Sequence, residues 1–120
     1  MTLQLQTAKV EPDITVVRLV GSLTAEPEGH ALQLLVRDLV DRGVKKLILD
    51  LSGVEKIDSA VAQFVLQSFF TMRQANGGLH LASATPKVAR LFKITGLDTL
   101  LPFYRTVSAA SVDFELAKGA

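Results

Sequence analysis

The stretch Ile57-Asp58-Ser59-Ala60-Val61-Ala62-Gln63-Phe64-Val65-Leu66 places an acid and a hydroxyl directly in front of an almost unbroken apolar run. Just upstream, Lys46-Leu47-Ile48-Leu49-Asp50-Leu51 is typical of a strand that is buried on both faces. The polar residues 52–56 between the two runs are expected to form a short loop. This order predicts a strand, a loop and a helix capped by Asp58 or Ser59. Backbone N–H groups at such a helix start favour a capping oxygen or a phosphate.

The composition indicates one compact domain. The chain has 120 residues, of which 48% are hydrophobic, and its formal net charge is +1. That length suits a single domain spanning residues 1–120, and the near balance of charge argues against disorder and against direct nucleic-acid binding. The absence of cysteine excludes a disulfide framework and a thiol nucleophile. We expect no signal peptide, no membrane insertion and a cytoplasmic protein.

Hydrophobic periodicity predicts an α/β domain with a mixed sheet of four to five strands packed with about four helices. Strands are expected at residues 3–7, 14–20, 44–51 and 79–82, with a short edge strand within 100–105. Helices are expected to begin at Thr24, Ser59, Thr85 and Ser108, and Gly43 and Gly96 suit the ends of the first and third. The side chains expected to face the core from these helices are Leu32, Leu35, Val36, Leu39, Val61, Ala62, Phe64, Val65, Leu66, Phe69, Phe70, Met72, Val88, Leu91, Phe92, Val112 and Leu116.

Ser59 is the first candidate functional residue. On chemistry alone, a serine that follows an aspartate at a helix start is most often a cap, and a phosphorylation site is the competing interpretation. A catalytic serine is less well supported, because the Gly-x-Ser-x-Gly pattern is missing and neither histidine is linked to Ser59 in the sequence. His30 and His80 are most simply surface or hydrogen-bonded histidines, and we expect no metal site and no cofactor.

Asp50 is the second candidate. An acid after a central strand is typical of a phospho-accepting receiver domain, but the acidic pair and the lysine that complete such a site are missing. The simpler interpretation is that Asp50 closes the strand or accepts hydrogen bonds from loop N–H groups.

Several segments together resemble the STAS domain, and more specifically the stand-alone bacterial anti-sigma-factor antagonists, or anti-anti-sigma factors. They are Asp50-Leu51-Ser52-Gly53-Val54 with Ile57-Asp58-Ser59, then Gly77-Gly78 before a strand, then Val88-x-x-Leu91 with Thr95-Gly96-Leu97-Asp98. Each segment is weak evidence by itself, but the combination at these separations is specific. The resemblance covers nearly the whole chain and implies a single STAS-like domain.

The resemblance implies a regulator rather than an enzyme. In that family an anti-sigma factor that is a serine/threonine kinase phosphorylates a serine in an Asp-Ser-Ser-Gly-Leu-Gly loop. The unphosphorylated form binds the kinase and so frees a sigma factor, and a phosphatase resets the switch. The first serine of the motif matches Ser59 and the aspartate matches Asp58. The resemblance therefore implies phosphorylation at Ser59, and a partner-binding surface that includes Asp58, Ala60, Val61, Gln63 and Thr24.

Several positions depart from the family pattern. Ala60 replaces the second serine, and Val61-Ala62-Gln63 replaces Gly-Leu-Gly. Thr24 stands where many relatives carry an aspartate. These changes leave an alternative open, namely a STAS interaction or scaffold subunit without a phospho-switch, in a stressosome-like assembly or a lipid-transport ATPase complex.

Overall fold

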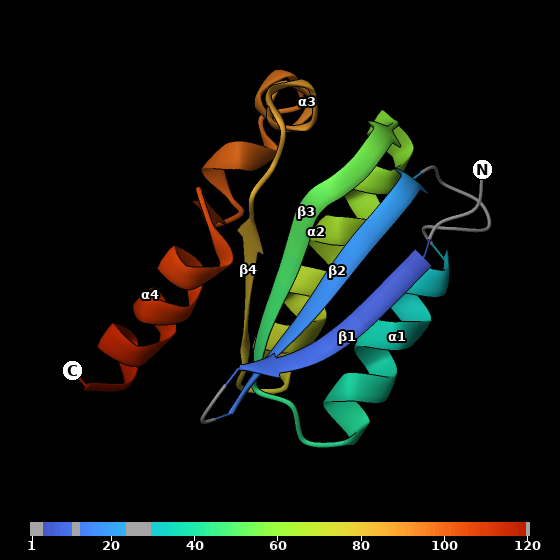
Figure 1. Cartoon of the computed structure of the whole chain (residues 1–120). Helices are drawn as coiled ribbons and strands as arrows, with labels where there is room; N and C mark the ends of the chain where they lie inside the picture. Colours follow the sequence, from blue (N-terminus) through green and yellow to red (C-terminus); the bar gives the residue numbers. More distant parts are fainter. Residues whose placement is uncertain (1–3, 11–12, 24–29, 120) are drawn as a thin grey trace.

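Five strands form one sheet in the order β1-β2-β3-β4-β5. The computed structural model describes residues 4–10, 13–23 and 30–119 (Figure 1). β1 pairs antiparallel with β2, and the pairs from β2 to β5 are parallel. The strands are β1 (Gln4–Val10), β2 (Ile14–Leu23), β3 (Lys46–Ile57), β4 (Gly78–Ala82) and β5 (Phe103–Tyr104). The predicted mixed sheet is confirmed, with β1 and the short β5 at its edges.

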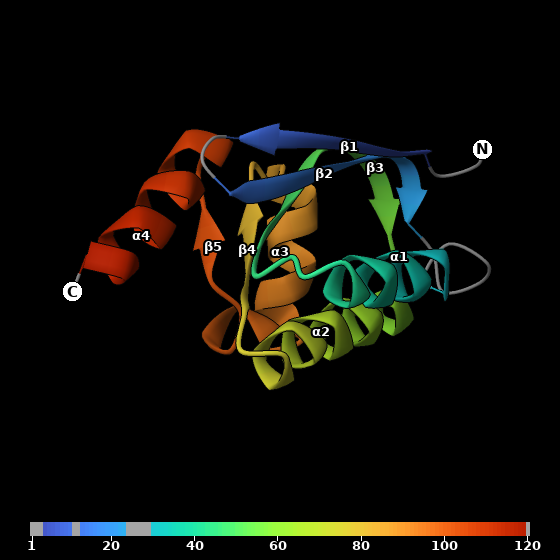
Figure 2. The same ribbon diagram turned by 90° about the horizontal axis from the view of Figure 1, so that it is seen from below.

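Helices cover the two faces of the sheet unequally. The helices are α1 (His30–Asp41), α2 (Ser59–Gln74), α3 (Pro86–Ile94) and α4 (Val107–Gly119), with a short 3-10 helix, η2 (Leu97–Thr99), after α3. Figure 2 shows α1, α2 and α3 on one side of the sheet and α4 on the other, beside β5. The sequence did not predict η2.

β3 is the buried centre of the domain, as its apolar run predicts. Leu47, Ile48 and Leu49 are all 0% exposed. Because side chains alternate along a strand, Leu47 and Leu49 join the large core under α1, α2 and α3, whereas Ile48 joins a smaller core with Ala110 and Phe114 of α4. β3 therefore holds both layers of helices on one sheet.

The loop predicted for residues 52–56 is wrong, because these residues belong to β3. β2 also runs further than expected, and the two strands pair as far as Leu23 and Ile57, with register shifts on the way. Gly53 permits this pairing, since a Cβ there would lie 2.9 Å from the carbonyl oxygen of Leu19. The strand continues because a neighbouring strand satisfies its backbone groups, which outweighs the polar composition of residues 52–56.

Most of the predicted helix ends are confirmed. Thr85 caps α3, Pro86 is its first residue, and Gly96 follows it with a φ of 77°. The predicted cap of α4 is wrong. Its first turn is held by Thr106, whose hydroxyl accepts a hydrogen bond of 3.0 Å from the N–H of Ala109, and Ser108 lies inside the helix.

The predicted core faces are largely confirmed, with two errors. Phe70 is 48% exposed and Val112 is 53% exposed. Each residue of a helix is rotated by about 100° from the one before, so burial of Phe69 turns Phe70 outward and burial of Ala110 places Val112 on the opposite side. The predictions for Leu3 and Thr24, and for the side chain of Leu116, fall outside the described part of the chain.

Candidate functional site

The candidate site lies where β3 ends and α2 begins. β3 ends at Ile57, and Asp58 adopts an extended conformation, with φ −112° and ψ 164°, before the helix begins at Ser59. The Asp58 carboxylate accepts a hydrogen bond of 2.8 Å from the backbone N–H of Val61, which is a standard N-cap contact. The sequence left two candidate caps, and the structure assigns the role to Asp58.

Because Asp58 is the N-cap, the Ser59 side chain is not needed as the capping acceptor of the helix. Ser59 is exposed, and its hydroxyl makes no hydrogen bond to any residue that the structure describes. The first turn of α2 carries no acidic residue of its own. Its outermost backbone N–H groups have no acceptor inside the helix and give this end a partial positive charge. An anionic group on Ser59 would therefore lie in a favourable field.

The other predicted site residues divide by burial. Ala60 and Gln63 are exposed, and Asp58 is partly exposed, so these side chains share a surface with Ser59. Ser59 and Gln63 lie one turn apart on α2, which places them next to each other along one side of the helix. We call Asp58, Ser59, Ala60 and Gln63 the switch surface.

The prediction that Val61 contacts a partner is corrected by the structure. Its side chain is 0% exposed and packs in the core under the sheet. The apolar pattern of α2 required this, because Val61 begins the stripe that continues to Val65. Its backbone N–H serves the site instead by bonding to Asp58.

Thr24, the remaining predicted contact, lies outside the described residues. Its neighbour Leu23 is paired with Ile57 at the end of the sheet. The chain therefore leaves β2 next to the point where it enters Asp58 from β3.

Glu55 and Lys56 are exposed residues near the switch surface that the sequence analysis placed in a loop. Both residues lie near the end of β3, and Lys56 pairs with Ser22. The signal that could have located them is in β2, where Leu19, Gly21 and Leu23 alternate with less buried residues. That alternation indicates that β2 continues to Leu23 and needs a partner of equal length.

Asp50 lies within β3 rather than at its end. Its carboxylate accepts a hydrogen bond of 3.0 Å from the N–H of Ser52, and seven more residues of the strand follow it, to Ile57. The expected hydrogen bond from a backbone N–H is present, but its donor lies in the strand rather than in a loop, and Asp50 does not close the strand. A receiver-like site, which depends on an acid exposed at the end of a strand, therefore loses its structural basis.

His80 is a structural residue on the opposite side of the sheet from α2. Its Nδ1 lies 3.0 Å from the carbonyl oxygen of Ala110, and its ring stacks on Phe114 with a centroid distance of 3.6 Å. Because the carbonyl can only accept, Nδ1 carries the hydrogen. Burial lowers the pKa of His80 below its usual 6.5, although the bond to Ala110 and the Asp113 carboxylate oppose this shift.

Asp113 and Tyr104 complete the contacts around His80. The Tyr104 hydroxyl donates a hydrogen bond to the Asp113 carboxylate, and the His80 Nε2 lies 3.8 Å from the same carboxylate. Burial and Asp113 together raise the pKa of Tyr104 to about 12. These contacts fasten α4 to β4 and β5, and none of them involves the switch surface.

None of the described helices combines the length with the hydropathy that a membrane-spanning segment requires.

Comparisons with known proteins agree with the geometry. The family model of the STAS domain matches residues 6–110. A protein of Bordetella bronchiseptica, provisionally named the anti-sigma factor antagonist BtrV, is 33% identical over 78 residues, which cover 65% of this chain and 67% of that protein. A crystal structure of a Thermotoga maritima protein with the same provisional functional name is 27% identical, covers 91% of this chain and 92% of its own, and has a TM-score of 0.82.

The anti-sigma factor antagonist SpoIIAA shares the fold in both of its states. Its unphosphorylated form has a TM-score of 0.69 at 17% identity, covering 92% of this chain and 96% of that one. The phosphorylated form, from Bacillus, has a TM-score of 0.68 at 18% identity, covering 90% and 97%. Together with the match over residues 6–110, the sheet order and the arrangement of helices show that this chain belongs to the STAS domain family.

Proposed function

We propose that this protein is an anti-sigma factor antagonist that binds an anti-sigma serine/threonine kinase, and that phosphorylation of Ser59 switches the binding off. In its unphosphorylated form the protein holds the kinase and so frees a sigma factor, and a phosphatase restores this form. The protein acts by binding, without catalysis of its own. The observation that carries the proposal is the division of roles at the start of α2, where Asp58 caps the helix and Ser59 is left exposed.

The division of roles makes Ser59 a suitable phospho-acceptor. A serine whose hydroxyl caps its own helix must give up that bond before it can be modified, whereas Asp58 already supplies the cap here. In the reaction the Ser59 oxygen forms a bond to the γ-phosphorus of ATP, the bond from that phosphorus to the β–γ bridging oxygen breaks, and the hydroxyl proton is lost as ADP leaves. The fold does not need to change.

The effect on the partner is electrostatic. A phosphate adds about −1.5 to −2 charge at neutral pH, and here it would lie next to the Asp58 carboxylate. A kinase surface shaped for the hydroxyl of Ser59 and the small side chain of Ala60 would then face a concentration of negative charge that it must desolvate. A loss of about 1.4 kcal/mol of binding free energy weakens binding tenfold. A loss of a few times that amount would therefore dissociate the complex. Both SpoIIAA forms match the fold of this chain about equally well, with TM-scores of 0.69 and 0.68, which supports a switch that acts through the surface rather than through refolding.

The departures from the family motif fall inside the same turn. Val61 and Ala62, which replace the glycine and leucine of the family motif, are buried and begin the core stripe of α2. These two changes therefore alter the core and not the surface. Ala60 and Gln63 remain on the surface and make it different from that of relatives with the Ser-Gly-Leu-Gly sequence. We infer that these two residues select the kinase partner.

The test is to capture a serine/threonine kinase from lysate on the immobilised protein, and then to measure its binding to the wild type, Ser59→Ala and Ser59→Asp. We expect Ser59→Ala to bind like the wild type and to resist phosphorylation, and Ser59→Asp to bind at least tenfold more weakly. Ser108→Asp is the matched control, because Ser108 is also an exposed serine in the first turn of a helix but lies on α4. Mass spectrometry of the peptide that contains Ser59 then reports whether phosphate appears there with ATP.

Equal binding by Ser59→Ala and Ser59→Asp would overturn the switch. A stable partner that never modifies Ser59 would instead support the alternative, a STAS scaffold subunit in a stressosome-like or lipid-transport ATPase assembly.

A further inference from the structure

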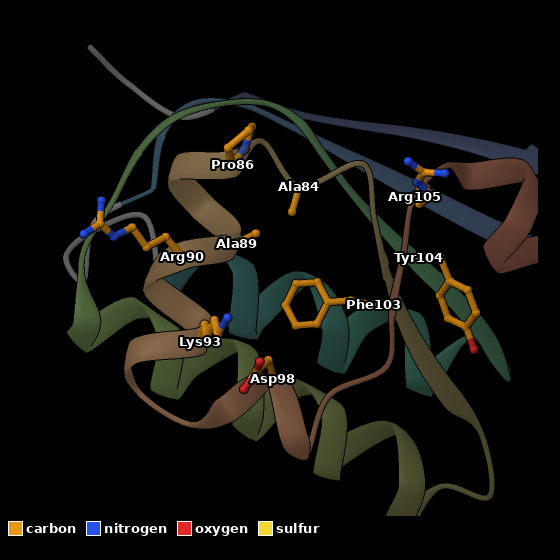
Figure 3. Close-up of a pocket in the computed structure, with 9 residues that line it drawn as sticks. All are labelled: Ala84, Pro86, Ala89, Arg90, Lys93, Asp98, Phe103, Tyr104 and Arg105. Carbon is orange, nitrogen blue, oxygen red and sulfur yellow. The ribbon is translucent and has the colours of Figure 1, made fainter.

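A second candidate site lies between α3 and the edge strand β5. It is an open pocket of about 680 Å³. This volume lies within the range of small-molecule sites in proteins. Figure 3 shows the pocket with Phe103 pointing from β5 toward α3. Residues of α3, η2 and β5 line the pocket together with Ala84 and Arg105, and none of them belongs to the switch surface.

The inner wall of the pocket is apolar and already formed. The Phe103 ring packs edge-on against the buried Phe92, with a centroid distance of 5.1 Å and an interplanar angle of 61°. Ala84 and Ala89 contribute short side chains that leave space in front of this ring. The Tyr104 side chain points away from the Phe103 ring in Figure 3, and it contacts His80 and Asp113 instead. Phe103 is therefore the aromatic surface that a ligand would contact.

The rim of the pocket is positively charged. Arg90, Lys93 and Arg105 line it together with a single acid, Asp98. All four are exposed, and no ion pair joins any of them to another residue that the structure describes. In Figure 3, Lys93 and Asp98 lie at one end of the pocket and Arg105 at the opposite end, with Phe103 between them, while Arg90 extends outward from α3.

This excess of cations is local. The whole chain carries 13 lysines and arginines against 12 aspartates and glutamates, whereas this one pocket has three cations and one carboxylate. An apolar wall next to cations that pair with no described residue is complementary to a molecule that has an apolar body and an anionic group.

We propose that the pocket binds a small amphipathic anion, with an aromatic or aliphatic body against Phe103 and a carboxylate or phosphate head held by Lys93 or Arg105. The body would displace water from the Phe103 ring and from the two alanines, while the head would gain charge-assisted hydrogen bonds. This ligand site is separate from Ser59, and the proposal does not depend on the phospho-switch.

The experiment is a fluorescence titration of the full chain with the aromatic sulfonate 8-anilinonaphthalene-1-sulfonate, followed by competition. Decanoate and decyl phosphate, both kept below their micelle concentrations, test the carboxylate and the phosphate head. Decanol tests the apolar body without charge, and inorganic phosphate tests the charge without an apolar body. We expect saturable binding at one site that is displaced at least tenfold more effectively by the two amphipathic anions than by either control.

Charge variants locate the site. The double variant Lys93→Gln/Arg105→Gln removes the cation that holds the head at whichever end of the pocket it binds, and should weaken binding of the probe by roughly tenfold. Lys87→Gln is the matched control, because Lys87 is also an exposed lysine on α3 but does not line the pocket. Thermal unfolding of each variant verifies that the fold is retained.

Three results would overturn the proposal. They are no saturable binding of the probe, equal displacement by decanol and decanoate, and equal binding by the double variant and Lys87→Gln. If decanoate and decyl phosphate both compete, their relative affinities identify the preferred head group.

Discussion

Replacing Asp58 tests the division of roles on which the proposed switch depends. Asp58→Ala removes the carboxylate that accepts the 2.8 Å hydrogen bond from Val61 and leaves that N–H without its cap. Loss of an N-cap side chain typically costs about 1 kcal/mol of unfolding free energy, within a range of about 0.5–2. For a chain of this size the same loss lowers the melting temperature by roughly 4 °C.

Ser59→Ala is expected to behave differently at the neighbouring position. The Ser59 hydroxyl is exposed and bonds to no described residue, so its removal should change the unfolding free energy by less than about 0.5 kcal/mol. Ser59→Asp should leave stability unchanged or raise it by a few tenths of a kcal/mol. The helix N-terminus favours the added charge, while the adjacent Asp58 partly offsets the gain.

The assay is equilibrium unfolding in urea, with the slope and the midpoint fitted for each variant. Asp58→Asn is the matched control, because asparagine caps helices about as well as aspartate while removing the charge. It should retain most of the stability that Asp58→Ala loses, at an unchanged slope. The reasoning is refuted if Ser59→Ala costs as much as Asp58→Ala, because the serine would then be the cap and its phosphorylation would disturb the helix itself.

Three further predictions concern the sheet and the residues around His80. Gly53→Ala should lower the unfolding free energy by about 1–3 kcal/mol, because its Cβ would lie 2.9 Å from the Leu19 carbonyl oxygen; urea unfolding measures this, with the exposed Ser52→Ala as control. Burial lowers the pKa of His80, so the unfolded chain binds a proton below pH 6.5 that the folded chain resists. Unfolding free energy should therefore fall as the pH drops below about 6.5, and His80→Gln should flatten this dependence. Tyr104→Phe should cost about 1 kcal/mol by removing the hydrogen bond to Asp113, and a cost near zero would show that this bond is exchanged for water without loss.

Local signals predicted the central part of the fold. Continuous apolar residues identified Leu47 to Leu51 as a doubly buried strand, and Thr85-Pro86 identified the start of α3. These features depend on residues that are adjacent in sequence, so a single chain segment carries the information. The family resemblance identified Ser59 as the candidate phosphorylation site.

Features that depend on distant residues were not predictable in the same way. The extension of β3 through Lys56 requires the matching length of β2, and the exposure of Val112 requires knowledge of which side of α4 meets the sheet. The choice between Asp58 and Ser59 as the cap rests on a single hydrogen bond, since both residue types are good caps. The pocket beside Phe103 forms only when α3, η2 and β5 come together, because Arg90 and Lys93 come from α3 whereas Arg105 directly follows β5.

The order of strands in the sheet also has a consequence for how the chain acquires its structure. Each strand pairs with the strand that follows it along the chain, so the sheet can grow by one strand at a time without waiting for a distant segment. During synthesis on the ribosome, β1 to β4 can assemble with α1 and α2 while later residues are still being added.

The smaller core, between the sheet and α4, can form only later in synthesis. Ile14, Val16 and Ile48 are covered by Ala110 and Phe114, which are supplied by α4 after all the strands. Until α4 emerges, the nascent sheet presents an apolar face that chaperones or other nascent chains could engage. The emergence of α4 from the ribosome is therefore the step that buries the second apolar face of the sheet and completes the fold.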